Sequence, residues 1–457
     1  MPIDSTQSFT VQVNTSPTGN KWYIATTGNN TTGDGSLAKP WATIQKGMDT
    51  AVGGDVVYVR GGTYHEHVII TKSGSAGKPI TLTNYGSEVV TIDGTGISLS
   101  SYNCLLDIGN DSIYPAYITI QNLNVTNSSQ CGIGTHWLTG KTSPCHDITV
   151  QYCTITNMTY NAIFFCNENG NAMNNINVNH CTMTNIQIGQ NTGEGNTFES
   201  VSNSQFNYNT IRQCYKICFA VCGTSHDVLI DHNDVDASYI CSSCICMGVD
   251  GGQTNGQHCD DITFSNNFIH GTGQLLSFTS EIGSATYLLR ITFVNNILVV
   301  GSGGLGFVTY LSTSQNMCTD VVFKHNTIYT LSGAGDAIQL NGRTNNYYVR
   351  FVMANNIIYR VGATRMMNTA FSNGTVTNNL YYSTAGAPTS TGLPLGTSYQ
   401  NADPKFVTTG TDFHLQSTSP AINNGSSSTN GYMSYTWPTD FDGKTRVAPP
   451  DIGAYEY

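Results

Sequence analysis

Acidic side chains are scarce in this chain of 457 residues, in which Asp, Glu, Lys and Arg together make up 10%. Asp250 ends the segment ICMGVD, Glu281 ends LLSFTSE, and Glu194 follows a similar apolar run. On neighbouring strands of one sheet, two carboxyl groups would lie about 5 Å apart, because strands are spaced by about 4.8 Å. Retaining glycosidases hold their carboxyl pair about 5 to 5.5 Å apart and inverting ones about 6.5 to 9.5 Å apart. The spacing therefore predicts glycoside hydrolysis by Asp250 with Glu281 or Glu194.

Aromatic and polar side chains occur at the same strand ends and in the loops just beyond them. Aromatic rings stack on the apolar faces of sugars while the sugar hydroxyls keep their hydrogen bonds. We therefore expect a sugar-binding groove beside the carboxylates. Its predicted lining is His136, Trp137, Glu168, Lys216, Tyr310 and Arg343.

A second chemistry is open to the same groove. A lyase needs a base that removes the proton beside a uronate carboxylate, and a cation that stabilises the resulting enolate. The candidate bases are Lys216, Arg212, Tyr215, Tyr310 and His136. Carboxylate oxygens suit Ca²⁺, and the candidate ligands are Asp231, Asp234 and Asp236 in DHNDVD, or Asp250 with Asp260 and Asp261.

One phrase recurs along the chain and indicates which elements must position these residues. It reads ITIQNLNV at 118, ITVQYCTI at 148, ITFSNNFI at 262 and ITFVNNIL at 291. One of its positions is occupied in turn by Leu123, Cys153, Cys181, Asn209, Asn233, Asn267, Asn296, Asn326, Asn356 and Asn379. The successive spacings are 30, 28, 28, 24, 34, 29, 30, 30 and 23 residues, a period typical of a solenoid.

The alternation inside each repeat has the period of a strand. Apolar and polar residues alternate with period two rather than 3.6, which excludes helical repeats. Asn suits a tight turn because it tolerates the left-handed backbone region, and stacked Asn side chains bond from one coil to the next. The sequence therefore predicts an all-β solenoid of about ten or more coils with an Asn ladder.

Coils of about 30 residues with an Asn ladder resemble the right-handed, single-stranded parallel β-helix of pectate-lyase-like proteins, over residues 21 to 385. The resemblance implies that the substrate lies across the strand after the Gly-rich turn, where inward residues such as Ile188 and Phe278 set the alignment. It implies a polysaccharide partner and either hydrolysis, which needs no cofactor, or cation-assisted lysis. Because one fold carries many functions, a non-catalytic adhesin, a structural fibre or a phage tail spike is a further alternative.

The two ends of the chain predict caps. Trp41 to Ala51 reads as a short amphipathic helix that closes the first coil, with Ile44 and Met48 on its apolar face. The stretch ADPKFV, DFHLQSTSPAINNG, DFDGKTRVAPPDIGAYEY resembles the closing module called choice-of-anchor Q, which implies a cover over the other end. The expected parts are a tail (1–20), a cap with the first coils (21–100), the β-helix (101–385) and a C-terminal capping module (386–457).

The fourteen cysteines allow two interpretations. Stacked coils bring Cys153 near Cys181 and Cys218 near Cys246, within the separation that a disulfide needs. They are therefore coil-to-coil disulfides or stacked core thiols, and zinc is a weaker alternative.

Composition excludes some partners. The net charge of −11 comes with no basic stripe that could neutralise phosphates, so nucleic acid is not expected. No apolar stretch is long enough to cross a bilayer, and the first thirty residues lack the basic start and apolar core of a signal peptide. We expect an extracellular or cell-surface protein, or a virion part, that is a monomer, or a trimer if it is a tail spike.

Overall fold

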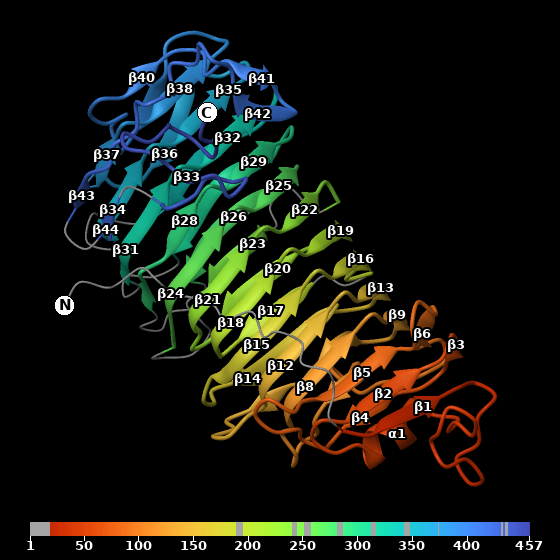
Figure 1. Cartoon of the computed structure of the whole chain (residues 1–457). Coiled ribbons are helices and arrows are strands. Elements are labelled where there is room, and N and C mark those ends of the chain that lie inside the picture. The colour runs from red at the N-terminus through yellow and green to blue at the C-terminus, as the bar shows by residue number, and fades with distance from the viewer. Residues whose placement is uncertain are drawn as a thin grey trace.

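The computed structural model describes residues 19–457 except 189–194, 240–244, 251–256, 281–286, 312–316, 342–347, 373, 431–432 and 435–436. The described strands form three long parallel sheets, and each coil of the chain contributes one strand to each sheet in turn. Figure 1 shows these coils stacked into one elongated body, with the N-terminal coils at the red end and the C-terminal coils at the blue end. The predicted parallel β-helix is confirmed.

Sheet 1 holds the first strand of each coil. Its strands are β1 (Lys21–Ile24), β2 (Val56–Val59), β5 (Ile80–Asn84), β8 (Ala116–Gln121), β12 (His146–Gln151), β15 (Met173–Asn179), β18 (Val201–Asn207), β21 (His226–Asp231), β24 (His258–Ser265), β27 (Tyr287–Leu289), β28 (Thr292–Val294), β31 (Met317–Lys324), β34 (Tyr348–Ala354) and β37 (Thr375–Thr377).

Sheet 2 follows sheet 1 after a sharp turn. Its strands are β3 (Gly62–Tyr64), β6 (Val90–Asp93), β9 (Asn124–Ser128), β13 (Thr154–Met158), β16 (Thr182–Ile186), β19 (Thr210–Cys214), β22 (Asp234–Ala237), β25 (Phe268–Gly271), β29 (Ile297–Val300), β32 (Thr327–Thr330), β35 (Ile357–Arg360), β38 (Leu380–Ser383) and β40 (Gln400–Asn401).

Sheet 3 completes each coil. Its strands are β4 (Val68–Ile70), β7 (Cys104–Ile108), β10 (Cys131–Gly134), β14 (Ile163–Glu168), β17 (Asn196–Glu199), β20 (Phe219–Cys222), β23 (Ile245–Asp250), β26 (Gln274–Ser280), β30 (Leu305–Leu311), β33 (Ile338–Asn341), β36 (Arg365–Thr369) and β39 (Thr389–Thr391), with β11 (Leu138–Thr139) beside β14. Outside the sheets lie two hairpins, β41 (Phe406–Thr408) with β42 (Asp412–Leu415) and β43 (Thr429–Asn430) with β44 (Met433–Ser434).

The predicted Asn ladder joins sheet 1 to sheet 2. The side-chain amide of Asn233 donates to the Asn267 carbonyl oxygen at 2.9 Å, Asn267 donates to Asn296 at 2.9 Å, and Asn296 donates to Asn326 at 3.0 Å. Each amide also donates to a backbone carbonyl of an earlier strand, such as Phe264 O at 2.9 Å. The ladder therefore satisfies buried polar groups at every turn, as buried polar groups require.

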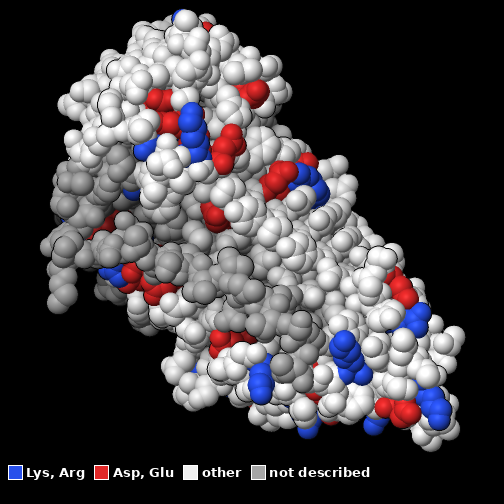
Figure 2. Space-filling view, viewed as in Figure 1, with Lys and Arg blue, Asp and Glu red and all other residues white. Residues whose placement is uncertain are grey.

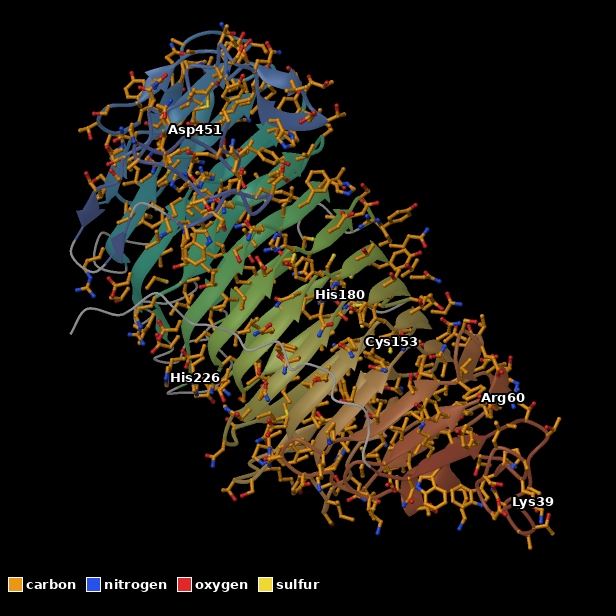
Figure 3. The ribbon with its side chains drawn as sticks, viewed as in Figure 1. Lys39, Arg60, Cys153, His180, His226 and Asp451 are labelled. Atoms are coloured by element: carbon orange, nitrogen blue, oxygen red, sulfur yellow. The ribbon has the colours of Figure 1, made fainter. Side chains whose placement is uncertain are left out.

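The residue just before each ladder position has a left-handed backbone, with φ between +49° and +60° in the turns from Asn122 to Asn378. In the middle coils these residues are aromatic and stack on one another. Ring centroids are 4.9 Å apart for Tyr152 and His180, 5.0 Å for His180 and Tyr208, and 4.7 Å for Tyr208 and His232. His180 lies at this corner in Figure 3. The rings face one another, which strengthens the corner and leaves mainly ring edges to the solvent.

The N-terminal cap is confirmed. Helix α1 (Ile44–Thr50) begins after Thr43, whose hydroxyl accepts a hydrogen bond from the backbone N–H of Lys46. Ile44 and Met48 are buried in the continuous core of the solenoid, together with Ala51 just after the helix. The helix therefore closes the apolar interior of the first coils.

The C-terminal part differs from the prediction. The coils continue through β39 and β40, which pair with β36 and β38, so the solenoid reaches Asn401 rather than 385. Residues 402–457 lie largely along the outer face of sheet 2, where Phe406 and Phe413 pack on Tyr329 and Tyr359. The last coils carry apolar residues on both faces of sheet 2, and these outward residues decide where the C-terminal part docks.

Buried charges hold this C-terminal part in place. The Arg446 guanidinium is buried beside the Glu456 carboxylate at 3.2 Å and also donates to Asn295 on the solenoid at 3.0 Å. Asp440 and Asp451 accept hydrogen bonds from backbone N–H groups of this segment. They therefore have turn and cap roles.

Of the two cysteine interpretations, the described residues show stacked core thiols: twelve cysteines there are free and eleven of these are buried. The sulfurs of Cys218 and Cys246 lie 3.4 Å apart as stacked thiols. Cys153 and Cys181 precede the Asn residues in the ladder column and are buried in the core. Burial raises the pKa of the Cys181, Cys214 and Cys218 thiols, as it does for any thiol removed from water.

No helix in the described residues has the length and apolar character needed to cross a membrane.

The ladder generates a first prediction. The Asn296 side chain accepts from the backbone and side chain of Asn267 and donates to Phe264 O and Asn326. Asn296→Ala should lower the free energy of unfolding by about 3 kcal/mol, because buried partners lose their hydrogen bonds. Urea unfolding followed by circular dichroism measures the change. The control is Asn401→Ala at an exposed strand end, expected to stay within about 0.5 kcal/mol; equal losses would contradict the role of the ladder.

The C-terminal part generates a second prediction. Burial lowers the pKa of His414, but the Asp442 and Asp412 carboxylates at 2.8 and 2.6 Å outweigh burial, so the pKa is raised from 6.5. The ion pairs therefore stabilise the fold below pH about 6.5 and lose this effect as pH rises through the raised pKa. The melting temperature of wild type should exceed that of His414→Gln more at pH about 5.5 than at pH about 8.5. A difference independent of pH would contradict this assignment.

Candidate active site

The outer face of sheet 3 carries the chemistry-bearing residues of the middle coils. Register fixes one column on this face, because Cys166 pairs with Glu199 and Glu199 pairs with Cys222 on consecutive coils. Val249 pairs with Val221, and Asp250 is the next residue of β23. Asp250 therefore follows Glu199 and Cys222 in the same column, two coils from Glu199.

Glu199 is the residue of this column with the clearest chemical contacts. Its strand neighbour Phe198 is buried in the core and packs against Phe219, so the alternation of the strand turns Glu199 outward. The Cys166 thiol donates a hydrogen bond to the Glu199 carboxylate over 3.1 Å. The carboxylate is half-buried, which suits a group that acts on a substrate at the surface.

The alignment by inward residues takes Ile188 as the inward residue of this coil and puts Glu194 in the loop just beyond, so it does not single out Glu199. In the structure, Asn196 pairs with Ile163 and Phe198 pairs with Phe165, so β17 begins at Asn196 instead. Glu194 lies outside the described residues. The sequence does contain a pattern that could have identified Glu199. In NTFE the apolar Phe198 precedes an acidic residue, just as Val249 precedes Asp250.

The expected register of Asp250 with Glu281 is wrong. Asp250 pairs with Thr279, and Thr279 pairs with Tyr310 on the next coil. Leu276, not Phe278, pairs with Met247, so the alignment was displaced by two residues at this coil. Glu281 lies beyond the column and outside the described residues, as does Arg343.

An aromatic patch lies one to three coils before Glu199. We define it as Tyr102, Trp137, Tyr160 and Phe164, with ring centroids 4.6 Å apart for Tyr102 and Trp137, 5.3 Å for Tyr102 and Tyr160, and 5.7 Å for Tyr102 and Phe164. Trp137 is 39% exposed. Its ring N–H donates to the Glu168 carboxylate at 3.1 Å, so an exposed ring and a carboxylate lie side by side, as sugar binding requires.

Gly134 allows the backbone to bring Trp137 to this place. Its φ is +153°, and an added Cβ would lie 1.9 Å from the carbonyl oxygen of Phe164 on the next coil. The chain bends here between β10 and β11, and β11 pairs with the end of β14 at Glu168. The bend carries Trp137 alongside Glu168.

The other predicted binding residues are spread more widely. His136 is buried and its ring Nε2 lies 3.0 Å from the Asp111 carboxylate, so its ring is already engaged. Lys216 is half-buried in the loop before β20, near the same coil as Cys222. Tyr310 lies on β30, where it pairs with Asn341. Of the predicted set, the structure brings together Trp137 and Glu168.

The expected calcium ligands do not form one site. Asp231 ends a strand of sheet 1 and binds His232, Ser265 and Asn266 at 2.6 to 2.8 Å. Asp234 lies on sheet 2 and is bound by Arg212 at 2.5 Å, while Asp236 accepts from the backbone of Ser238. The three carboxylates belong to two different sheets and contact different partners, so they do not gather around one point in the described structure.

In the second calcium alternative, Asp260 and Asp261 face an arginine. Arg290 binds both oxygens of Asp261 at 2.8 and 2.9 Å and also contacts Asp260. Burial, followed by the charge of Asp261, raises the pKa of Asp260. These residues lie on sheet 1, near the strand that starts at His226 and on the edge where Figure 3 labels that residue. Among all described residues, no three His, Cys, Asp or Glu side chains gather as metal ligands would.

Comparison with known proteins supports the architecture. Residues 22–217 match a model of the Pel9A-like right-handed β-helix region. The uncharacterized protein YwoF of Bacillus subtilis is 33% identical over 125 residues, which are 27% of this chain and 26% of YwoF. Pectate lyase PEL9 of Emericella nidulans is 44% identical over 62 residues, which are 13% of this chain and 15% of that protein. The chain thus spans about a quarter or less of these curated relatives.

A solved structure covers nearly the whole chain. XylC in complex with xylose has a TM-score of 0.58 at 12% identity, over 95% of this chain and 98% of that one. The Pel9A-like match ends before the C-terminal stretch, whose resemblance to a choice-of-anchor Q module stays a prediction. The matched family model describes a right-handed β-helix, and the strands of this chain form the stacked parallel sheets of such a helix. The chain is a right-handed parallel β-helix protein.

Proposed function

We propose that this protein hydrolyses a polysaccharide that lies along the outer face of sheet 3, with Glu199 and Asp250 as the acid and base pair. The observation that carries the proposal is their shared column, two coils apart. Two coil steps correspond to about 9.6 Å between backbones. Inverting glycosidases hold their carboxyl groups about 6.5 to 9.5 Å apart, with room for a water molecule, and retaining ones only about 5 to 5.5 Å apart. The backbone separation is close to the upper end of the inverting range and far from the retaining one, so the proposed reaction inverts the anomeric centre.

The two carboxyl groups take different roles in this proposal. Glu199 accepts a hydrogen bond from the Cys166 thiol, which orients its carboxylate on the outer face of the sheet. We assign Glu199 as the base that activates water and Asp250 as the acid that protonates the leaving oxygen. The Cys222 position between them marks the coil over which the scissile bond lies.

The aromatic patch supports this placement of the substrate. Trp137 and Glu168 lie on the two coils before Glu199, which is about 5 to 10 Å along the solenoid. An exposed indole ring binds a sugar face and the neighbouring carboxylate binds its hydroxyls. A chain held there continues over Glu199 and Asp250. Such polymers occur outside cells, so we propose an extracellular or cell-surface location.

Glu194 and Glu281 stay predicted catalytic residues, in segments that flank the strands β17 and β26. In the sequence, Glu194 comes a few residues before Glu199, and Glu281 comes a few residues after Thr279. Each therefore remains an alternative catalytic partner for Asp250. Separate Gln variants of both residues belong in the same assay as Glu199.

A uronate lyase is the second candidate, favoured by the similarity to pectate lyase PEL9 and to the Pel9A-like model. Lys216 and the nearby Tyr215 are the base candidates on the coil of Cys222. The carboxylates expected to hold calcium are engaged with Arg212, Arg290 and their own turns. We therefore place hydrolysis first and derive no step through a metal.

Two variants test the catalytic pair. Glu199→Gln and Asp250→Asn should each lower turnover at least about 100-fold, since each removes a proton-transfer group that contributes this much or more. The assay follows new reducing ends on a panel of plant, algal and bacterial polysaccharides. Asp236→Asn, a carboxylate on sheet 2 away from the groove, is the control and should keep full turnover.

The same panel separates the candidates. Reducing ends without the ultraviolet absorbance of an unsaturated sugar support hydrolysis, whereas that absorbance supports the lyase. Inversion is read from the anomer first formed, by NMR. Full turnover in both Glu199→Gln and Asp250→Asn would show that another pair acts. Absence of turnover on the whole panel would favour an adhesin or fibre.

A further inference from the structure

A cavity of about 610 Å³ lies at the entrance to sheet 3 in the last coils. It opens between the loop before β33 and the loop that joins β35 to β36. Its polar lining consists of Asp336, Gln339, Thr364, Arg360 and Arg365. Gln339 pairs with Val308 and Asn368 on the neighbouring coils. The cavity therefore lies on the same face of the solenoid as Glu199.

Two arginines share one carboxylate in this cavity. Arg365 binds both oxygens of Asp336 at 2.9 Å. Arg360 contacts the same carboxylate at 3.4 Å and donates to the carbonyl oxygen of Gly335 at 2.5 Å and to that of Arg365. Asp336 and Arg360 are buried, with side chains 7% and 3% exposed, while the Arg365 side chain is 48% exposed.

The charges of this group do not balance. Two guanidinium groups carry two positive charges and Asp336 carries one negative charge, and a buried charge without a counterion is unfavourable. Burial lowers the pKa of Arg360, although Asp336 opposes this effect. The Nε of Arg360 is buried and has no hydrogen-bond partner among the described residues. The cavity thus has one excess positive charge and one unused donor.

Positive charge is uncommon in this chain, which has 18 Lys and Arg residues and a net charge of −11. Figure 2 shows charged side chains as small separate groups, with wide uncharged areas between them. Other arginines pair with at least as many carboxylates, as Arg350 does with Asp320 and Arg290 does with Asp260 and Asp261. The cavity differs from those pairs because it holds a second, buried arginine.

We propose that this cavity is a subsite that binds the carboxylate of an acidic sugar residue. The proposal rests on the proposed function, because it treats the ligand as part of the polysaccharide cleaved at Glu199. Five coil steps separate β17 from β33, about 24 Å along the solenoid, so one extended chain reaches both. The subsite makes the substrate a uronate-containing polymer.

Guanidinium geometry favours a carboxylate. A planar carboxylate accepts two parallel N–H bonds from a guanidinium, as Asp336 already does from Arg365. The half-exposed Arg365 and the buried Arg360 both line the cavity. A sulfated sugar is tetrahedral and makes a poorer match to this planar pair, so it serves as a competing ligand in the test.

Binding measurements test the subsite independently of turnover. Calorimetry is performed with the full chain and trisaccharides of galacturonate, glucuronate and mannuronate, with the methyl ester of each, and with a sulfated trisaccharide. At least one acid should bind ten times more tightly than its neutral ester. Arg365→Gln should remove this preference, and Gln339→Glu should weaken the acid at least tenfold by repulsion.

The matched control is Arg350→Gln, which removes an arginine from an exposed bidentate pair on sheet 1 and should keep the preference. Equal binding of acids and esters, stronger binding of the sulfated sugar, or equal losses in Arg350→Gln and Arg365→Gln would each overturn the subsite. Glu199→Gln should bind the acids as tightly as wild type. Retained preference without turnover on any glycan would overturn hydrolysis alone, and turnover without preference would overturn the subsite alone.

Discussion

The Asn ladder is the interaction on which the rest of the structure depends. Each coil makes a sharp turn between sheet 1 and sheet 2, and such a turn leaves buried backbone groups without strand partners. The inward Asn amides bond to those groups and to the next Asn. Because the same bond repeats from Asn209 to Asn379, the coils stack in one register. That register places every outward residue of sheet 3.

Constant register turns sequence spacing into distance. Residues in one column are separated by multiples of about 4.8 Å, so Glu199 and Asp250 are two steps apart whatever the lengths of their loops. The aromatic patch and the arginine cavity lie on the same face, before and after this pair. The face therefore presents a row of sites at fixed steps, which suits a polymer better than a small molecule.

Charged residues are few in this chain, and most of the described ones have specific hydrogen-bond or ion-pair partners. Most described acids are held by an arginine, a histidine or backbone N–H groups, as Asp234, Asp231 and Asp451 are. The Asp336 group, with two arginines for one acid, departs from this pattern. This group joins the end of β35 on sheet 2 to the start of β36 on sheet 3, whereas the acidic DHNDVD segment serves turns and sheet 2.

The sequence by itself determined the solenoid, the Asn ladder, the N-terminal helix and the place of Asp250 at the end of a strand. All of these depend on local alternation of residue types and on the repeat of one turn. Tertiary structure decided the rest. Coil length varies between 23 and 34 residues, so only strand pairing shows that Asp250 lies opposite Thr279 and that β17 starts at Asn196. The docking of residues 402–457 along sheet 2 and the meeting of Arg360 with Asp336 join segments from different coils, and a repeat pattern holds no information on such long-range contacts.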